Sequence, residues 1–473
     1  MKKLILIALF ASLSAFTVLL SACTEKVTLQ RDVMSFEVTF VNPPACGHTA
    51  GDACPFSLVA GSFTTRLRIR ALNEHHELAT NFYKSVMITT VPSGMFVSGP
   101  GVHLLPDNRK VLVVALSGGV WEGDVSFIGS FGELRLLVED MGYEPAPNAT
   151  TAACASLFPA QGCYAPDDDN PQAGTGAVGV SDKLHFHNPR LVDIQRPWDE
   201  SLVTNRSRDK EASPLSGFRV TVEGDPYLGT ANCAPGESRL VVTAISVSGF
   251  NMTDVCDPAL PDYAHLYIYN FNTPEETSRG DCVLSIQGAI MEFQGFTEMK
   301  NPLWEVDRCE TGDSFCTVGQ PKCTAFLPAP VEITASMLGS LLTMEKLESA
   351  IVEVRNVTSS SQFLRCDANG DGVIDYAIPE EKNCKFDCGD EVGCVVKEDY
   401  DIYFTWTVDV GGVEVGVVTQ GVVPFDPEAT GNLGLPIHRV RGMLKHLDFG
   451  APAWIILPRD ARDVCLTEAD CED

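Results

Sequence analysis

Residues 63–70 read FTTRLRIR. The odd-numbered positions carry Phe, Thr, Leu and Ile, whereas the even-numbered positions carry Thr and three Arg, and residues 36–40 (FEVTF) repeat this alternation. Successive side chains of a β-strand point to opposite faces, so a period of two places one set against a core and the other in water. Both stretches therefore predict half-buried strands.

Short apolar runs at 111–116, 125–128 and 134–138 continue this pattern between Gly-containing and Pro-Asp turns. Many short strands at such spacing are typical of a β-sandwich. Residues 68–94 and 132–142 resemble the strand–turn–strand rhythm of bacterial immunoglobulin-like modules. The resemblance implies an immunoglobulin-like sandwich, which we place at residues 33–197 with a cysteine-pinned loop at 143–180.

The second half of the chain carries a different pattern of strands. Residues 282–299, CVLSIQGAIMEFQGFTEM, resemble the OB-fold modules that accompany catalytic domains in secreted bacterial nucleases. The residues that match the strand pair, its hairpin and the Pro-x-Pro stretch after it are Gly288, Ile290, Phe293, Gly295, Phe296, Thr297, Pro328 and Pro330. A second copy starts near Ala350 and ends in residues 441–464.

This resemblance implies two OB-like barrels, at 215–345 and 346–464, after a linker at 198–214 and before a C-terminal tail at 465–473. The resemblance does not imply nuclease activity, because nothing in this sequence resembles the separate metallophosphoesterase domain that hydrolyses nucleic acid in those proteins. The expected fold class is all-β: a sandwich followed by two barrels, rich in disulfides.

The N-terminus has the features of an export signal. Lys2 and Lys3 precede an apolar run over 4–20, and residues 20–23 (LSAC) resemble the lipobox of bacterial lipoproteins. That resemblance implies cleavage after residue 22, a lipid on Cys23, and a tether over 23–32 at the membrane. The alternatives are an ordinary secretory signal or a transmembrane anchor, for which the apolar run is short. Thr24 stands where an inner-membrane retention signal often has Asp, which favours the outer membrane.

Cysteine usage agrees with an exported chain. Of 17 cysteines, one is assigned to lipid, which leaves 16 and predicts up to eight disulfides. Close spacing suggests three local pairs: Cys46 with Cys54, Cys154 with Cys163, and Cys465 with Cys471. Four further cysteines, at 366, 384, 388 and 394, suggest zinc as an alternative, although their spacing lacks a paired C-x-x-C arrangement.

The clearest local motif is DANGDGVID at residues 367–375. In an EF-hand-type loop, oxygens at positions 1, 3, 5, 7 and 9 surround the ion and position 6 is Gly. Position 12 is Ile378 instead of Glu, so Glu380 or Glu381 would have to supply the last ligand. We expect a structural calcium site within an insert at 366–394 of the second barrel, or else a solvated turn. Its ligands would be Asp367, Asn369, Asp371, Val373, Asp375 and Glu380.

The net charge and the motifs of the sequence disfavour nucleic-acid binding and the common classes of enzyme. The chain has 34 basic and 63 acidic residues, a net charge of −29, which repels phosphate backbones and disfavours nucleic acid. No nucleophile elbow, Walker motif or dinucleotide fingerprint occurs in the sequence, and His185 and His187 offer a metal only two ligands. We expect no enzyme.

The sequence therefore favours a lipid-anchored, non-catalytic binding or scaffold protein of the bacterial cell envelope, with a protein or glycan partner. The alternative is an accessory subunit that presents substrate to a separately encoded nuclease or hydrolase. Some aromatic residues could stack on a ligand, and we expect about half of them to pack inside the protein instead. These residues are Tyr263, Tyr267, Tyr269, Phe271, Phe293 and Phe296.

Overall fold

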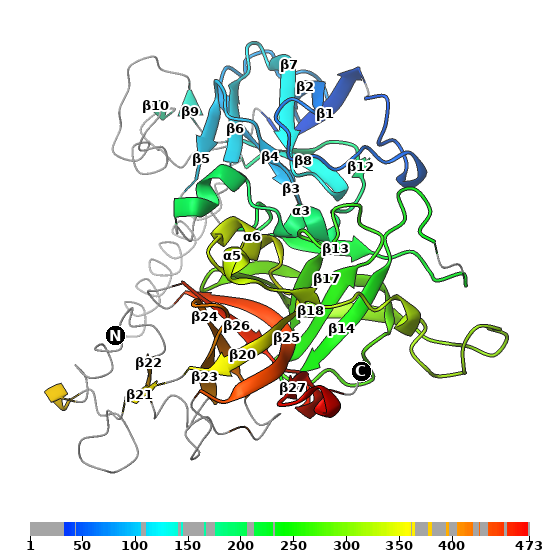
Figure 1. The fold of residues 1–473 in the computed structure, drawn as a ribbon. Coiled ribbons are helices and arrows are strands. Elements are labelled where there is room, and N and C mark those ends of the chain that lie inside the picture. The colour runs from blue at the N-terminus through cyan, green and yellow to red at the C-terminus, as the bar shows by residue number, and fades with distance from the viewer. Residues whose placement is uncertain are drawn as a thin grey trace, which may run out of the picture. The chain divides into compact units, whose positions relative to one another are not determined.

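The computed structural model describes residues 33–471, with gaps (Figure 1). The gaps are 43, 106–109, 141–142, 145–164, 167–175, 206–211, 230–231, 361, 365–376, 381–393, 397–403, 420–424, 426–433 and 449–451. The chain divides into two compact units, residues 1–186 and 187–473. Strands dominate both units and the helices are short, so the predicted all-β fold is confirmed.

The first unit is an immunoglobulin-like sandwich around one apolar core. Its sheet has the order β4-β7-β2-β1-β11-β8-β3-β6-β5, with β12 also on β8, and β1 pairs antiparallel with β2 but parallel with β11. The strands are β1 (Ser35–Asn42), β2 (Thr64–Leu72), β3 (Ser85–Val91), β4 (Met95–Phe96), β5 (Val102–Leu104), β6 (Lys110–Ala115), β7 (Val120–Ile128), β8 (Gly132–Asp140), β11 (Val178–Val180) and β12 (Leu184–Phe186).

The alternation seen in the sequence decides which face of this sheet is buried. In β2, Leu67 and Ile69 are fully buried, while Arg66 and Arg68 point outward and pair with Glu122 of β7. The unit also contains η1 (Ala50–Asp52) and a two-stranded ribbon of β9 (Tyr143–Glu144) and β10 (Ala165–Pro166). The strands predicted at 125–128 and 134–138 fall within β7 and β8, and the strand predicted at 111–116 corresponds to β6 except for residue 116, which lies one position beyond its end.

The second unit begins with α3 (Leu191–Gln195) and η2 (Glu200–Asn205), and continues into a closed barrel. Its order is β13-β17-β14-β15-β16-β18, closed by β17–β18 pairing, with β16 and β18 parallel. This is the five-stranded Greek-key topology of an OB barrel with β13 added at one edge. The strands are β13 (Arg219–Glu223), β14 (Leu240–Ser246), β15 (Gly249–Asp254), β16 (His265–Tyr269), β17 (Cys282–Phe293) and β18 (Phe296–Asp307).

The second barrel repeats this topology, with β24 and β26 as its parallel pair and β20–β25 closing the ring. Its strands are β19 (Val331–Glu332), β20 (Ile351–Ser359), β23 (Thr405–Asp409), β24 (Glu414–Val418), β25 (Pro436–Asp448), β26 (Pro452–Leu457) and β27 (Val464–Cys465). A parallel ribbon of β21 (Gln362–Leu364) and β22 (Cys394–Val396) lies in the insert between β20 and β23. Short 3-10 turns are η3 (Thr324–Phe326), η4 (Ala461–Asp463) and η5 (Glu468–Asp470).

The boundaries of the modules differ from those suggested by the sequence at two places. Residues 187–197 belong to the second compact unit and not to the sandwich, and Arg190 there binds the first barrel through Asp254. Helices α5 (Ala335–Leu338) and α6 (Leu341–Lys346) pack into the core of the second barrel, together with Ile333. That core therefore begins near residue 331.

The two barrels share a packed seam. Tyr267 and Phe296 of the first barrel pack against Ile351 and Met443 of the second. The Asn251 amide donates to the Ser349 carbonyl (2.9 Å), and the Thr297 backbone N–H donates to Oε1 of Glu348 (3.0 Å). Apolar packing and buried hydrogen bonds thus join the barrels within the second unit.

Among the described residues there are five disulfides. Cys46–Cys54 and Cys465–Cys471 confirm two of the predicted local pairs, and Cys154 and Cys163 lie outside the described residues. The other three disulfides are Cys233–Cys256, Cys282–Cys323 and Cys309–Cys316. Two of these pairs join residues 23 and 41 positions apart, a separation at which spacing alone does not suggest the pairing. Cys309 and Cys316 are only 7 positions apart, so sequence reasoning missed a pair as closely spaced as those it predicted.

Candidate binding surface of the first barrel

An exposed aromatic surface lies on the outside of the first barrel, where β16 ends. In β16, Leu266 and Ile268 are fully buried, so Tyr267 and Tyr269 point away from the barrel interior. Tyr269 is paired with Lys300 of β18 across the parallel ladder. Phe293, at the end of β17, is paired with Phe296 across the hairpin. The registers therefore bring side chains from three strands to one outer face.

Three rings and one cation form what we call the aromatic platform: Tyr269, Phe271, Phe293 and Lys300. Phe271 is 61% exposed and Phe293 is 43% exposed, which is unusual for large apolar side chains. The rings of Tyr269 and Phe271 meet edge to face, with centroids 4.6 Å apart. The Lys300 ammonium lies 5.5 Å from the Tyr269 ring centre and 5.4 Å from that of Phe293. Cation–π attraction thus links the platform across strands.

The backbone around the platform has a positive φ at three non-glycine positions. Phe271, Gln294 and Asn301 have φ values of 61°, 55° and 51°, in the left-handed region that non-glycine residues rarely adopt. Gln294 and Gly295 form the two-residue turn between β17 and β18, where positive φ matches the strand twist. Phe271 is not in a two-residue hairpin turn, so turn geometry does not account for its positive φ. Strain of this kind gathers at functional sites.

The platform adjoins the loops that OB barrels use for binding. The Asn270 backbone N–H donates to the Ser248 carbonyl (2.8 Å), so the β14–β15 turn lies beside the end of β16. Tyr267 bonds to the hydroxyls of Ser246 (3.1 Å) and Ser248 (2.8 Å). OB barrels bind oligosaccharides and oligonucleotides on the face of their second and third strands and on two loops beside it. In this barrel those loops correspond to the β14–β15 turn and the β17–β18 hairpin.

The remainder of the same outer face is covered by the second barrel. Tyr267 and Phe296 are buried in the seam, and the Lys445 ammonium lies 5.4 Å and 4.6 Å from their ring centres. Burial lowers the pKa of Lys445, and Glu298 opposes that shift. Glu298 also pairs with Lys300 (3.0 Å). One aromatic face therefore has a buried half, used for packing, and an exposed half.

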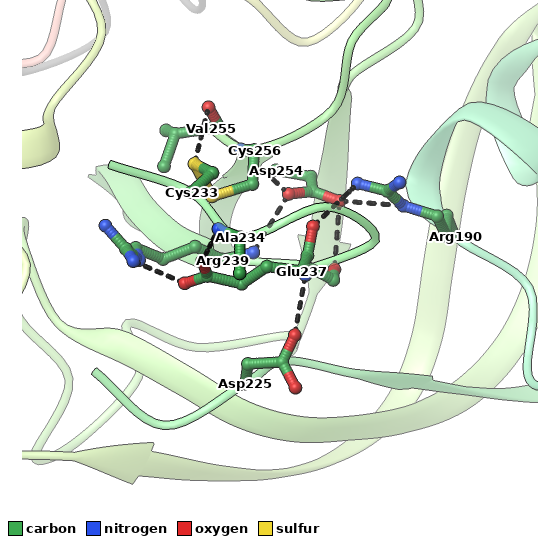
Figure 2. The surroundings of a disulfide bond; sticks show 10 residues. Arg190, Asp225, Cys233, Ala234, Glu237, Arg239, Asp254, Val255 and Cys256 are labelled. Atoms are coloured by element: carbon green, nitrogen blue, oxygen red, sulfur yellow. Dashed lines mark hydrogen bonds and ion pairs between the residues drawn. A yellow bond between two sulfur atoms is a disulfide. The ribbon is translucent and has the colours of Figure 1, made fainter. Parts of the chain in front are cut away.

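A second charged cluster, around the Cys233–Cys256 disulfide, is saturated with internal partners (Figure 2). Asp254 is fully buried and its carboxylate accepts from Arg190 (2.7 Å), from the Ser238 hydroxyl (2.9 Å), and from the backbone N–H groups of Arg239 (3.0 Å) and Cys256 (3.1 Å). Both oxygens of the buried Asp254 carboxylate therefore have their hydrogen bonds within the protein. This cluster fixes the fold and leaves no oxygen of Asp254 for a ligand.

The structure places few of the sites predicted from sequence. Cys23 and Asp367, Asn369, Asp371, Val373 and Asp375 lie outside the described residues, while Glu380 is exposed. Of the four cysteines considered for zinc, only Cys394 is described, in β22. β12 ends at Phe186, so His187 lies beyond the strand that holds His185, and the two do not form a strand pair.

The aromatic residues divide as the sequence suggested. Tyr263, Tyr267 and Phe296 are buried, whereas Phe271 and Phe293 are exposed and Tyr269 is half-buried. Sequence reasoning missed Lys300, which is one of 34 basic residues and stands out only through its neighbours. A signal was present in the sequence, because Glu298 and Lys300 follow Phe296 at the period-two spacing of one strand face.

Comparison with known protein families finds no matching family model, and comparison with curated proteins finds no matching relative. In the part of the chain that the structure describes, no helix has the length and apolar character needed to cross a bilayer. Functional assignment therefore depends on the chemistry of the platform.

Proposed function

We propose that this protein is a non-catalytic binding protein, lipid-anchored in the bacterial cell envelope, whose first barrel holds a glycan on the aromatic platform. The observation that carries the proposal is the exposure of Phe271 and Phe293 beside the half-buried Tyr269, with the Lys300 ammonium over the rings of Tyr269 and Phe293. Exposed aromatic residues gathered on one face are typical of binding sites, because water solvates them poorly. Phe271 also sits in strained backbone, which points to a role for its ring.

A glycan suits this surface for electrostatic reasons. The face of an aromatic ring carries partial negative charge and attracts the C–H groups of a sugar ring. Lys300 and the neighbouring side chains of Asn272, Gln294 and Asn301 supply donors for hydroxyl or carboxylate groups. Nucleic-acid bases would stack equally well, but their phosphates would approach a chain with net charge −29. These arguments favour a sugar polymer.

The test is a titration of residues 24–473 with polysaccharides from the envelope, alongside single-stranded DNA and envelope proteins. We expect glycan binding with a Kd that rises about 10-fold or more in Phe271→Ala and in Phe293→Ala, since a stacked ring contributes ~1–3 kcal/mol. Tyr83→Ala is the matched control, because Tyr83 is an aromatic residue of the first unit with 57% exposure. It should bind as the native chain does.

Two results would contradict the glycan assignment. If the native chain binds DNA or a protein tightly and both variants lose that binding, the platform is the binding site but its ligand is not a glycan. If both variants still bind the glycan as the native chain does, the platform is not the glycan-binding site. A nuclease or hydrolase recovered with the chain would support the second candidate, an accessory subunit that presents substrate, which the tandem OB topology also favours.

The anchor and the calcium loop are parts of the same proposal. A diacylglycerol on Cys23 would hold the chain at the membrane, and a calcium ion would neutralise the acids of residues 367–375 in the insert between β20 and β23. Mass spectrometry of the chain extracted from membranes tests the anchor. An N-terminus that is neither cleaved before Cys23 nor acylated would contradict it.

A further inference from the structure

A second cluster of polar side chains lies buried beside the seam, apart from the platform. Glu345, Glu348 and His446 are 3%, 1% and 1% exposed, and each offers a ligand atom within 4.8 Å of the others. Glu345 is in α6, Glu348 follows its last turn, and His446 is in β25. The Ser349 backbone N–H donates to the Leu444 carbonyl (2.9 Å), which holds the turn against β25.

The surroundings of His446 select one tautomer of the neutral ring. Nδ1 lies 3.1 Å from the carbonyl oxygen of Gly295, which can only accept, so Nδ1 carries the proton. Nε2 of the neutral ring then carries a lone pair. The ring stacks on Trp454, with centroids 4.4 Å apart, and this contact fixes its plane. A backbone carbonyl that accepts from the outer nitrogen is the usual support of a histidine that binds a metal.

Glu348 supplies the observation that points to a missing ligand. Its Oε1 accepts from the Thr297 backbone N–H (3.0 Å), while its buried Oε2 has no hydrogen-bond partner among the described residues. An unsatisfied buried carboxylate oxygen costs free energy that a bound cation would remove. Asp254, by contrast, is saturated by protein groups.

We propose that Glu345, Glu348 and His446 bind one divalent transition-metal ion, with zinc as the best match. Two carboxylates and one imidazole form a mixed oxygen and nitrogen donor set, which suits zinc or manganese better than calcium or magnesium. The two negative charges balance a divalent ion. Zinc bonds of ~2.0–2.1 Å put tetrahedral ligands about 3.4 Å apart, so small side-chain movements would close the site.

This site differs from the calcium loop in place and in chemistry. All three ligands belong to the second barrel, whereas Gly295 and Thr297, which orient two of them, belong to the hairpin of the first. Metal binding would therefore stabilise the seam as well as the second barrel. The proposal does not depend on glycan binding by the platform.

The experiment measures metal binding by residues 24–473, the chain without its signal peptide and the cysteine expected to carry the lipid. The protein is stripped with a chelator, saturated with calcium, and titrated with Zn²⁺, while Co²⁺ substitution reports the coordination geometry by its visible spectrum. We expect one Zn²⁺ per chain, a raised thermal midpoint, and a tetrahedral or five-coordinate Co²⁺ spectrum. Glu348→Gln should weaken Zn²⁺ binding beyond the ~10–100-fold expected for loss of an outer-shell partner.

Glu353→Gln is the matched control, because Glu353 is a buried glutamate of the second barrel that pairs with Arg355 and is not one of the three ligands. It should bind Zn²⁺ with unchanged affinity. Glu348→Gln is nearly isosteric, so a folded variant is expected, and circular dichroism checks this. Two outcomes overturn the proposal: Zn²⁺ binding that Glu348→Gln leaves unchanged, or no Zn²⁺ binding by the native chain together with a higher thermal midpoint in Glu348→Gln. The latter would identify a carboxyl pair that shares a proton.

Discussion

The guanidinium of Arg190 lies 2.7 Å from the carboxylate of Asp254, whose side chain has no exposed surface. This ion pair joins the segment just before α3 to β15 of the first barrel, 64 positions later in the chain. Asp254 also holds the backbone on both sides of the Cys233–Cys256 disulfide, through Arg239 and Cys256 (Figure 2). The pair therefore fixes residues 187–197 to the second unit.

Removal of this cation should destabilise the second unit strongly. Arg190→Ala leaves the buried Asp254 carboxylate without its counter-charge, which should cost about 3 kcal/mol of unfolding free energy. Arg462→Ala is the comparison, since its pair with Asp460 is exposed on both sides and should contribute only ~0–1 kcal/mol. Urea unfolding of both variants provides the measurement. Equal losses in the two would show that burial does not decide the strength of the pair.

Strain at Phe271 predicts a divergence between stability and binding. Glycine adopts positive φ without the penalty that a Cβ brings, so Phe271→Gly should be more stable than Phe271→Ala by about 1 kcal/mol. Both variants lack the ring, and both should lose the same affinity for the platform ligand. Thermal unfolding and binding titrations check the two halves of this prediction. Equal stability of the two variants would mean that the backbone relaxes at position 271.

The buried His265 predicts a loss of stability in acid. Its Nε2 lies 3.0 Å from the Pro261 carbonyl, its Nδ1 lies 2.8 Å from the Thr253 hydroxyl, and complete burial lowers its pKa to about 4. An unfolded histidine has a pKa of about 6.5, so between pH 6.5 and 4 the unfolded state binds a proton that the folded state does not. The contribution of His265 to the free energy of unfolding is therefore fully present above pH 6.5, and the free energy of unfolding falls by about 3 kcal/mol as the pH approaches 4.

The comparison of the native chain with His265→Gln isolates this effect. Acids with a raised pKa, such as Glu292, change stability in the opposite direction, but they do so equally in both proteins. The native chain should therefore lose more of its thermal midpoint than the variant between pH 7 and pH 4.5. Parallel pH curves for the two proteins would rule out His265 as the source of acid sensitivity.

The disulfides should contribute unequally. Cys282–Cys323 joins residues 41 positions apart and both half-cystines are buried, whereas Cys465–Cys471 joins residues only 6 apart. Because a longer closed loop restricts the unfolded chain more, the paired alanine variants should lose about 4 and about 2 kcal/mol respectively. Denaturant unfolding of each double variant measures the difference. A larger loss for the C-terminal pair would contradict the loop-length argument.

Calcium removal tests the acidic loop. If the loop binds calcium at ~0.1–1 mM, a calcium chelator should expose residues 366–394 to protease and millimolar calcium should restore protection. Asp371→Asn should remove the effect of calcium without altering the digestion of the sandwich. Identical digestion with and without chelator would show that this motif is a solvated turn.

Much of the fold was predictable because it depends on near neighbours. Alternation in residues 63–70 predicts β2, since the two faces of a strand are a local property. The short-range disulfide Cys46–Cys54 follows from spacing for the same reason. The β17–β18 hairpin was expected from the resemblance of residues 282–299 to OB-fold modules. The start of the second barrel near residue 331 was not predictable, because α5 and α6 could have packed on either barrel.

Sequence alone determined that Tyr267 and Tyr269 share one face of a strand, because side chains two positions apart point the same way. Only the tertiary structure decided that Tyr267 packs in the seam while Tyr269 borders solvent, because a second barrel covers one end of that face. In the same way, Glu348 and His446 are 98 positions apart, and the closure of β20 on β25 brings them together. Local periodicity sets orientation, and long-range packing sets what each side chain meets.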